Sequence, residues 1–161
     1  MKIIWHEADG EYFDVSNNAF RRFRKDFVLP NSANEKGPAI YQVKIACSGK
    51  YLLYVNGTYI GRGPARYDRR WPQYDVLDIS DVVRSGSNTI AALCWYQGYG
   101  TGQSMVSPPG LVFELNGLGN DDPPRPILVS DESWKSSKAL AFNSGAPRIN
   151  GRQGIMEIFD A

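Results

Sequence analysis

Short apolar runs with a period of two recur along the chain, separated by clusters of Gly, Pro, Asn and Asp. In residues 39–47 the odd-numbered positions hold Ala, Tyr, Val, Ile and Cys, whereas Gln42 and Lys44 lie on the opposite face. This alternation is typical of a half-buried strand, and helical periodicity is scarce. The pattern therefore predicts an all-β fold, an antiparallel β-sandwich or barrel.

The predicted strands are 20–29, 39–47, 51–56, 58–61, 74–79, 89–95, 111–115, 127–130 and 155–159. Asn56-Gly57 lies between two of them and tolerates the positive φ angles of a two-residue type I′ hairpin turn. Residues 80–84 read as one capped helical turn, which Gly86 stops before the next strand.

Two connections, 63–73 and 96–109, are too long for tight turns, and loops of that length are often functional. Residues 117–126 read as an exposed connection. We expect residues 1–19 to form an N-terminal arm or first strand and residues 20–161 to form one sandwich domain. Neither an internal repeat nor an interdomain linker is visible.

The charge balance argues against some partners. The chain has 161 residues and a formal net charge of +1, so a broad basic field for nucleic acid or an anionic membrane is not expected. The densest basic stretch, Arg21 to Lys25, is interleaved with Phe20, Phe23 and Phe27 and is interpreted as a solvated strand face.

The numbers of cysteine and histidine residues limit which disulfides and metal sites the chain can form. Cys47 and Cys94, the two cysteines, lie in apolar runs and are interpreted as buried thiols, with a disulfide as the alternative. Together with the single histidine, His6, they cannot supply a zinc site. Neither a signal peptide nor a membrane-spanning apolar stretch is present, which favours a cytoplasmic protein or a segment of a longer secreted one.

The sequence predicts no catalytic machinery. Asp68, Asp75, Asp78 and Asp81 are the acids near aromatic loop residues, but Asp75 and Asp78 lie in or beside a predicted strand and Asp81 suits a helical turn. Neither cysteine has a base nearby in sequence for nucleophilic catalysis. The glycines between 98 and 102 lack the context of a phosphate-binding loop.

Carbohydrate binding needs aromatic faces flanked by planar polar side chains. Both long loops offer this combination, and the predicted sugar-contacting residues are Arg66, Tyr67, Asp68, Arg69, Trp71, Tyr96, Gln97 and Tyr99. Packing on the core or on a neighbouring domain is the alternative for Tyr67 and Trp71. Trp95 and Trp134 are expected to pack in the core, Trp134 with an edge position as a variant.

Three segments in succession carry a family resemblance: YLLYVNGTYIGRGP at 51–64, YDVLDIS at 74–80 and GSNTIA at 86–91. Together with VSDESWK at 129–135, read as a late strand, and EIFDA at 157–161, they resemble the N-terminal domain of bacterial α-L-rhamnosidases. The hairpin and the GxN segment also resemble accessory jelly rolls of β-galactosidase and β-glucuronidase relatives.

The resemblance implies a galactose-binding-like jelly roll attached to a catalytic (α/α)₆ barrel, which hydrolyses terminal α-linked rhamnose by inversion with acids of its own. Its implied partners are that catalytic domain and a rhamnose-containing glycan, and the chain is interpreted as a segment of a longer glycoside hydrolase. Some relatives hold rhamnose through calcium, but no loop here matches such a site. The nearest candidate, Asp121-Asp122, precedes two prolines, so no cofactor is assigned.

Two rival hypotheses stay open beside the accessory domain. One is a small stand-alone hydrolase with a carboxylate pair in its loops. The other is a structural or interaction module without a ligand. A sugar titration separates the accessory domain from the structural module, and an activity assay on this chain alone tests the hydrolase.

Overall fold

A computed structural model describes residues 1–5, 17–30, 40–68, 70–100, 105–119, 125–152 and 154–160. The strands are β1 (Ala19–Leu29), β2 (Ile40–Cys47), β3 (Lys50–Val55), β4 (Thr58–Gly63), β5 (Asp75–Asp78), β6 (Gly86–Tyr96), β7 (Leu111–Leu118), β8 (Arg125–Val129) and β9 (Lys135–Lys138). They form a five-stranded sheet in the order β4-β3-β6-β1-β9 and a four-stranded sheet in the order β5-β2-β7-β8.

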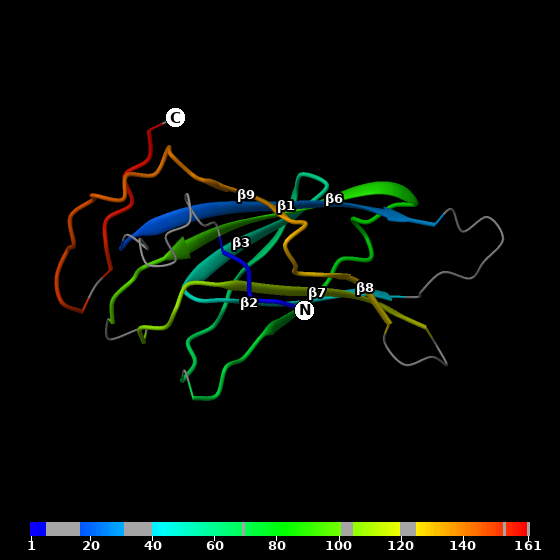
Figure 1. Ribbon diagram of the computed structural model, residues 1–161, viewed down its shortest axis with the longest axis horizontal. Coiled ribbons are helices and arrows are strands. Elements are labelled where there is room, and N and C mark those ends of the chain that lie inside the picture. Colours follow the sequence, from blue (N-terminus) through cyan, green and yellow to red (C-terminus); the bar gives the residue numbers. More distant parts are fainter. Residues whose placement is uncertain are drawn as a thin grey trace.

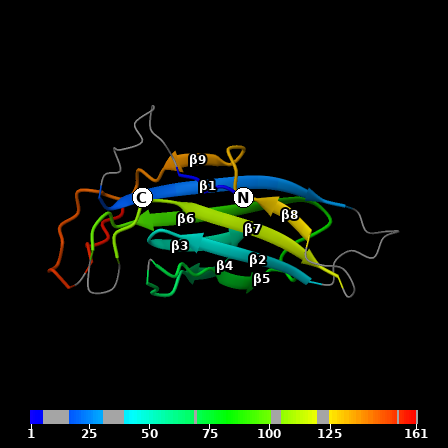
Figure 2. The same cartoon turned by 60° about the horizontal axis from the view of Figure 1, so that its bottom comes forward.

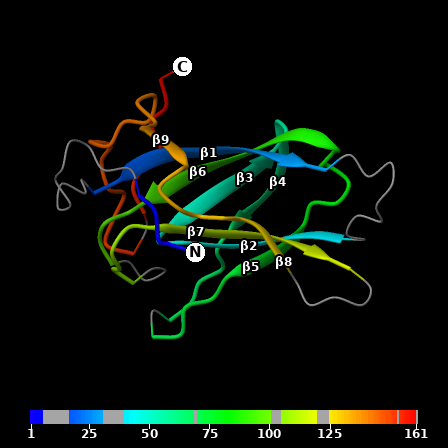
Figure 3. The ribbon, with the colours of Figure 1, turned by 45° about the vertical axis from the view of Figure 1, so that its right-hand side comes forward.

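The two sheets face each other as the layers of a sandwich (Figures 1 and 3). Every strand pairing is antiparallel. The described part of the chain contains no helix, and hence none that could cross a membrane. The predicted all-β antiparallel sandwich is confirmed.

The core lies between the sheets. It is built from the residues that face inward at alternating positions along the strands. Its buried members are Phe23, Val43, Ile45, Cys47, Tyr51, Leu53, Val55, Ile79, Ile90, Ala92, Cys94, Leu111, Phe113, Leu115 and Trp134. Both cysteines are free thiols, as expected, and burial raises the pKa of Cys94. Trp134 packs on Phe113 at a ring distance of 5.1 Å, which confirms its place in the core.

The Asn56-Gly57 turn between β3 and β4 has φ angles of 51° and 84° at its two central residues, which confirms the type I′ hairpin. The Asn56 amide also donates to the carbonyl oxygen of Val82 at 2.8 Å and to Oδ1 of Asn88 at 2.9 Å. Asn88 is buried at the start of β6, so the hairpin is tied to the turn that precedes β6.

The basic stretch in β1 is only partly solvated. Arg22 and Arg24 are exposed, but Arg21 is 6% exposed, and its guanidinium lies 5.9 Å from the ring centroid of Trp5. Alternation along β1 puts Arg21 on the same face as Phe23. The interpretation of the whole stretch as a wet face is therefore wrong for Arg21, and Phe20 lies on the face opposite to Phe23.

The last part of the chain departs from the prediction. Residues 155–159 form no regular strand; residues 141–152 and 154–160 instead form an irregular hairpin held by isolated bridges at Phe142–Phe159 and Arg148–Ile155. We call residues 139–160 the C-terminal hairpin. Residues 129–135 are not one strand either, because β8 ends at Val129, a turn follows, and β9 begins at Lys135.

The first residues lie against the sandwich. Ile4 forms an antiparallel bridge with Leu111 at the start of β7. Trp5 packs on Phe23 at a ring distance of 5.8 Å and on Tyr96 at 6.0 Å. Residues 1–5 therefore pack against the end of the sandwich where β6 ends and β7 begins. His6 lies outside the described residues.

Candidate functional site

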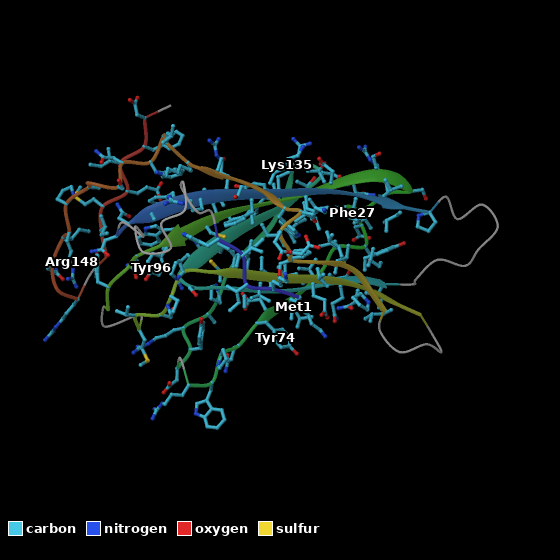
Figure 4. All side chains as sticks on the ribbon, viewed as in Figure 1. Met1, Phe27, Tyr74, Tyr96, Lys135 and Arg148 are labelled. Atoms are coloured by element: carbon cyan, nitrogen blue, oxygen red, sulfur yellow. The ribbon has the colours of Figure 1, made fainter. Side chains whose placement is uncertain are left out.

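The two long loops meet at one end of the sandwich. A cavity there, the loop-end cavity, is lined by residues from the β4–β5 loop, the β6–β7 loop and the β2–β3 turn. Of the predicted site residues, it brings together Arg66, Tyr67, Tyr96, Gln97 and Tyr99. Figure 4 shows Tyr96 at this end, on the same side of the molecule as Arg148 of the C-terminal hairpin.

Two glycines allow the chain to close up here. Gly49 has a φ of +123°, and a Cβ on it would lie 2.1 Å from the carbonyl oxygen of Trp95. Gly98 has a φ of +78°, and a Cβ there would lie 2.3 Å from the side-chain oxygen of Asn17. Both positions combine a left-handed backbone with close backbone approach, which only glycine accommodates without strain. The β2–β3 turn and residue 98 are thereby held against the sheet end.

Tyr96 packs within this end of the sandwich. It is 8% exposed, and its hydroxyl donates to the carbonyl oxygen of Ser107 at 2.8 Å. Burial also raises its pKa. Its ring packs on Trp5, so the side chain fixes the β6–β7 loop from beneath.

Tyr99 is covered on one face. The guanidinium carbon of Arg148 lies 4.5 Å from its ring centroid, a cation–π contact. The buried hydroxyl of Tyr99 has no hydrogen-bond partner within the part of the chain that the structure describes. An unpaired buried hydroxyl is costly, so this group is suited to an added polar partner such as a water or a ligand hydroxyl.

The β4–β5 loop points its aromatic and charged residues in different directions. Asp68 holds Arg70 through its carboxylate, with Arg70 Nη2 2.6 Å from Asp68 Oδ2, and Arg70 keeps the pKa of Asp68 low. Trp71 is 75% exposed and is not folded back on the core. Neither Asp68 nor Trp71 lines the loop-end cavity. Arg69 lies outside the described residues.

The loop-end cavity is small, at about 60 Å³. That volume holds a few water molecules, whereas pockets that enclose small ligands are typically about 300–1,000 Å³. Any sugar at this end would therefore lie on the surface, against exposed groups such as Trp71 and Arg66, and would not be enclosed.

A larger hollow, which the sequence did not predict, adjoins the first along Lys50, Pro64 and Ala65. It measures about 630 Å³ and lies on the outer face of the five-stranded sheet. Phe20 stacks between Trp95 and Phe142, with ring distances of 5.8 Å and 4.2 Å. Trp95 donates from Nε1 to Asn18 Oδ1 at 2.7 Å. The expectation that Trp95 packs in the core is wrong.

The position of Trp95 could have been found from the sequence. Ile90, Ala92 and Cys94 in β6 face the core, so the period of two puts Trp95 on the outside. Phe142 and Glu157, which complete the hollow, come from the C-terminal hairpin. No local sequence signal places that hairpin over β1.

Three of the acids near the loops, Asp68, Asp75 and Asp78, are engaged in structural contacts. Asp75 accepts a hydrogen bond from the Tyr51 hydroxyl at 2.6 Å, and Asp78 caps the turn through the backbone NH of Ser80 at 2.9 Å. Among the described residues, each carboxyl group with a shifted pKa has it lowered, here by hydrogen bonds or nearby cations. The general acid of a glycosidase needs a raised pKa.

The described residues contain no group of three or more His, Cys, Asp or Glu side chains that could hold a metal ion. Asp121 and Asp122, the nearest match to a calcium loop, lie outside the described residues. Calcium thus stays unassigned.

A family model for the α-L-rhamnosidase N-terminal domain matches residues 38–146. The chain belongs to this family. The match covers most of both sheets, including the Asn56-Gly57 hairpin and both long loops. As a member of this family, the chain is an accessory, non-catalytic domain, in agreement with the resemblance of its motifs.

Solved structures agree with this membership. A GH78 family rhamnosidase of Bacillus sp. GL1 matches with a TM-score of 0.82 and 30% identity, over 98% of this chain and 15% of that chain. An α-L-rhamnosidase of Streptomyces avermitilis, complexed with L-rhamnose, matches with a TM-score of 0.59 and 25% identity, over 84% of this chain and 12% of that chain. This chain thus spans only a small part of the length of these enzymes.

One further likeness concerns the fold alone. A lectin from Pleurotus ostreatus, solved in complex with GalNAc, matches with a TM-score of 0.60 and 22% identity, over 97% of this chain and 42% of that chain. A search of curated protein sequences found no match.

Proposed function

We propose that this chain is the N-terminal accessory domain of a longer enzyme that hydrolyses terminal α-L-rhamnosides, and that it supports the catalytic part of that enzyme. The observation that carries the proposal is the match to the Bacillus rhamnosidase over 98% of this chain but only 15% of that enzyme. We propose that a domain of this kind acts through contacts with the rest of its chain, since Asp68, Asp75 and Asp78 are engaged in structural contacts.

The C-terminal hairpin supplies a surface for such contacts. Leu140 is 82% exposed, Ile149 57% and Phe159 57%. Several large exposed apolar side chains on one segment make that segment a candidate interaction surface. We propose that this hairpin packs on the catalytic part of the longer enzyme, at the end of the sandwich shown at the left of Figure 1.

The test is to change these side chains in the longer enzyme. Leu140→Ser with Ile149→Ser should lower the temperature of half-inactivation by several degrees while leaving the stability of the isolated chain unchanged, since both side chains are exposed. Val28→Ser is the matched control, because Val28 is 72% exposed at the other end of β1. Equal effects of the double variant and the control would contradict the docking role.

A second candidate function is sugar contact at the loop end, and the exposure of Trp71 favours it. We propose that Trp71 supplies an aromatic face and that Arg66, Tyr67, Gln97 and Tyr99 supply hydrogen bonds. The ligand would be a rhamnose-containing glycan. Because such a site leaves much of the sugar in water, we expect a Kd of about 0.1–1 mM.

Calorimetry with rhamnose and rhamnose-capped oligosaccharides, with and without calcium, tests this site. Trp71→Ala and Tyr99→Ala should each weaken binding about tenfold, whereas Tyr59→Ala, an exposed aromatic in β4, should not. Binding that neither substitution weakens would place the site elsewhere. Absence of heat with every sugar would favour the structural role alone.

A further inference from the structure

The outer face of the five-stranded sheet carries an open trough. Two hollows of about 630 Å³ and 530 Å³ lie on this face and share Leu93 of β6. We call them together the outer-face trough. Figure 2 shows β9, β1, β6 and β3, the strands beneath it, in sequence across the sheet.

The strand register explains why this face is hollow. Ala91 of β6 lies opposite Tyr54 of β3 on one side and opposite Arg24 of β1 on the other. Lys135 of β9 lies opposite Arg24. A methyl group between two long side chains leaves a depression along the central strand. From Ala91 to Trp95 this strand extends about 13 Å, at about 3.3 Å per residue.

The two ends of the trough differ in charge. The hollow around Ala91 is lined by Arg22, Arg24 and Lys135, and no acid lines it among the described residues. Asp26 is an acid close to this hollow. Its carboxylate accepts a hydrogen bond from Arg24, with Arg24 Nη2 3.0 Å from Asp26 Oδ1. This pair is exposed, so it costs little to exchange Asp26 for another carboxylate.

The other end combines apolar surface with mixed charge. Leu93 and Trp95 form part of its lining. Arg62 and Lys50 bring cations, while Asp75 and Glu157 bring carboxylates. Asp75 already accepts from Tyr51. Aromatic and aliphatic surface beside hydrogen-bonding groups is what the two faces of a sugar ring require.

We propose that the outer-face trough binds an acidic glycan segment, with a uronic acid carboxylate held by Arg24 and Lys135. The sugar rings lie along β6 against Tyr54, Leu93 and Trp95. Arginine suits this role because its guanidinium pairs with a carboxylate through two parallel hydrogen bonds. The proposal does not depend on the rhamnosidase activity of a longer enzyme, nor on sugar contact at the loop end.

The test is calorimetry of this chain with oligogalacturonate and with the same oligosaccharide as its methyl ester, which lacks the charge. We expect binding of the acid form, weakened at least tenfold by esterification and by the double substitution Arg24→Gln with Lys135→Gln. Raising the salt concentration should also weaken it. Arg152→Gln, which removes an exposed cation from the C-terminal hairpin, should leave the affinity unchanged.

A second pair of variants tests shape without changing charge. Ala91→Leu fills the floor of the trough and should weaken binding at least fivefold. Ala46→Leu places the same side chain on the outer face of the four-stranded sheet and should have no effect.

Equal binding of the acid and its ester, or a loss of affinity in Arg152→Gln equal to that in the double variant, overturns the proposal. So does an absence of binding by the wild type, which would leave the trough as a packing surface for another part of a longer chain.

Discussion

Among single residues, hydrogen bonds lower the pKa of several carboxyl groups. Glu114 of β7 accepts from the Asn116 amide at 2.7 Å and lies 3.4 Å from the Lys44 ammonium. The Asn116 hydrogen bond, with a smaller contribution from Lys44, lowers the pKa of Glu114. A group whose pKa is lowered on folding stabilises the fold above its unfolded value of about 4.3. This stabilisation is lost as the pH falls through the folded value.

Glu114→Gln should therefore lower the free energy of unfolding by about 0.5–1 kcal/mol at pH 7. The difference from the wild type should shrink as the pH falls below 4, because both side chains are then uncharged. Urea unfolding of both proteins at pH 7 and pH 3 measures this difference in the free energy of unfolding. Glu157→Gln, which changes an exposed carboxyl in the C-terminal hairpin, is the control. A difference that stays constant with pH would show that charge is not the cause.

The burial of a side chain was predictable from the sequence where it depends only on the alternation of inward and outward positions along one strand. The buried thiols of Cys47 and Cys94 follow from it. The apolar run around Trp95 suggested burial, but its register relative to Cys94 puts it on the outer face. Phe142 completes that aromatic stack from a distant segment. Contacts of this kind depend on tertiary packing, which a local pattern does not encode.

At the scale of elements, the β3–β4 hairpin owes its geometry to its turn residues. Gly57 has a φ of +84°, and a Cβ there would meet nothing within 4 Å, so an added methyl group would act through backbone strain alone. Gly57→Ala should cost about 1–2 kcal/mol in the free energy of unfolding. Gly151→Ala is the matched control, since its Cβ would also meet nothing and its φ is not positive. Equal urea midpoints of the two variants would contradict this account.

Strands with an apolar face were predicted correctly from the sequence, whereas elements without such a face were not. The strands β2, β3, β6 and β7 alternate between core and outside, so the pattern located them within a few residues. β9 has the sequence KSSK with every side chain exposed, because it is an edge strand that buries no face. The C-terminal hairpin is held by isolated bridges, and several of its apolar residues, such as Leu140 and Phe159, are exposed instead of buried.

At the scale of the whole molecule, the fold gathers its long loops and the C-terminal hairpin at one end and leaves the outer face of the five-stranded sheet open. The first surface carries exposed apolar residues, and the second carries cations at one end and mixed charge at the other. The sequence predicted that the two loops are functional, and the structure brings part of both to one cavity. The sequence did not predict the small volume of that cavity, since Tyr96 packs there on Trp5 and Ser107 through contacts made only in the folded chain.

We propose that this chain is an accessory domain of a rhamnosidase and has no catalysis of its own. The most direct test is to measure the release of p-nitrophenol from p-nitrophenyl α-L-rhamnoside by the isolated chain and by a longer protein that contains it. We expect turnover by the longer protein and none by the isolated chain above the uncatalysed rate. Turnover by the isolated chain that is lost in Asp68→Asn or Asp75→Asn, or a longer protein inactive on every rhamnoside, would contradict the claim.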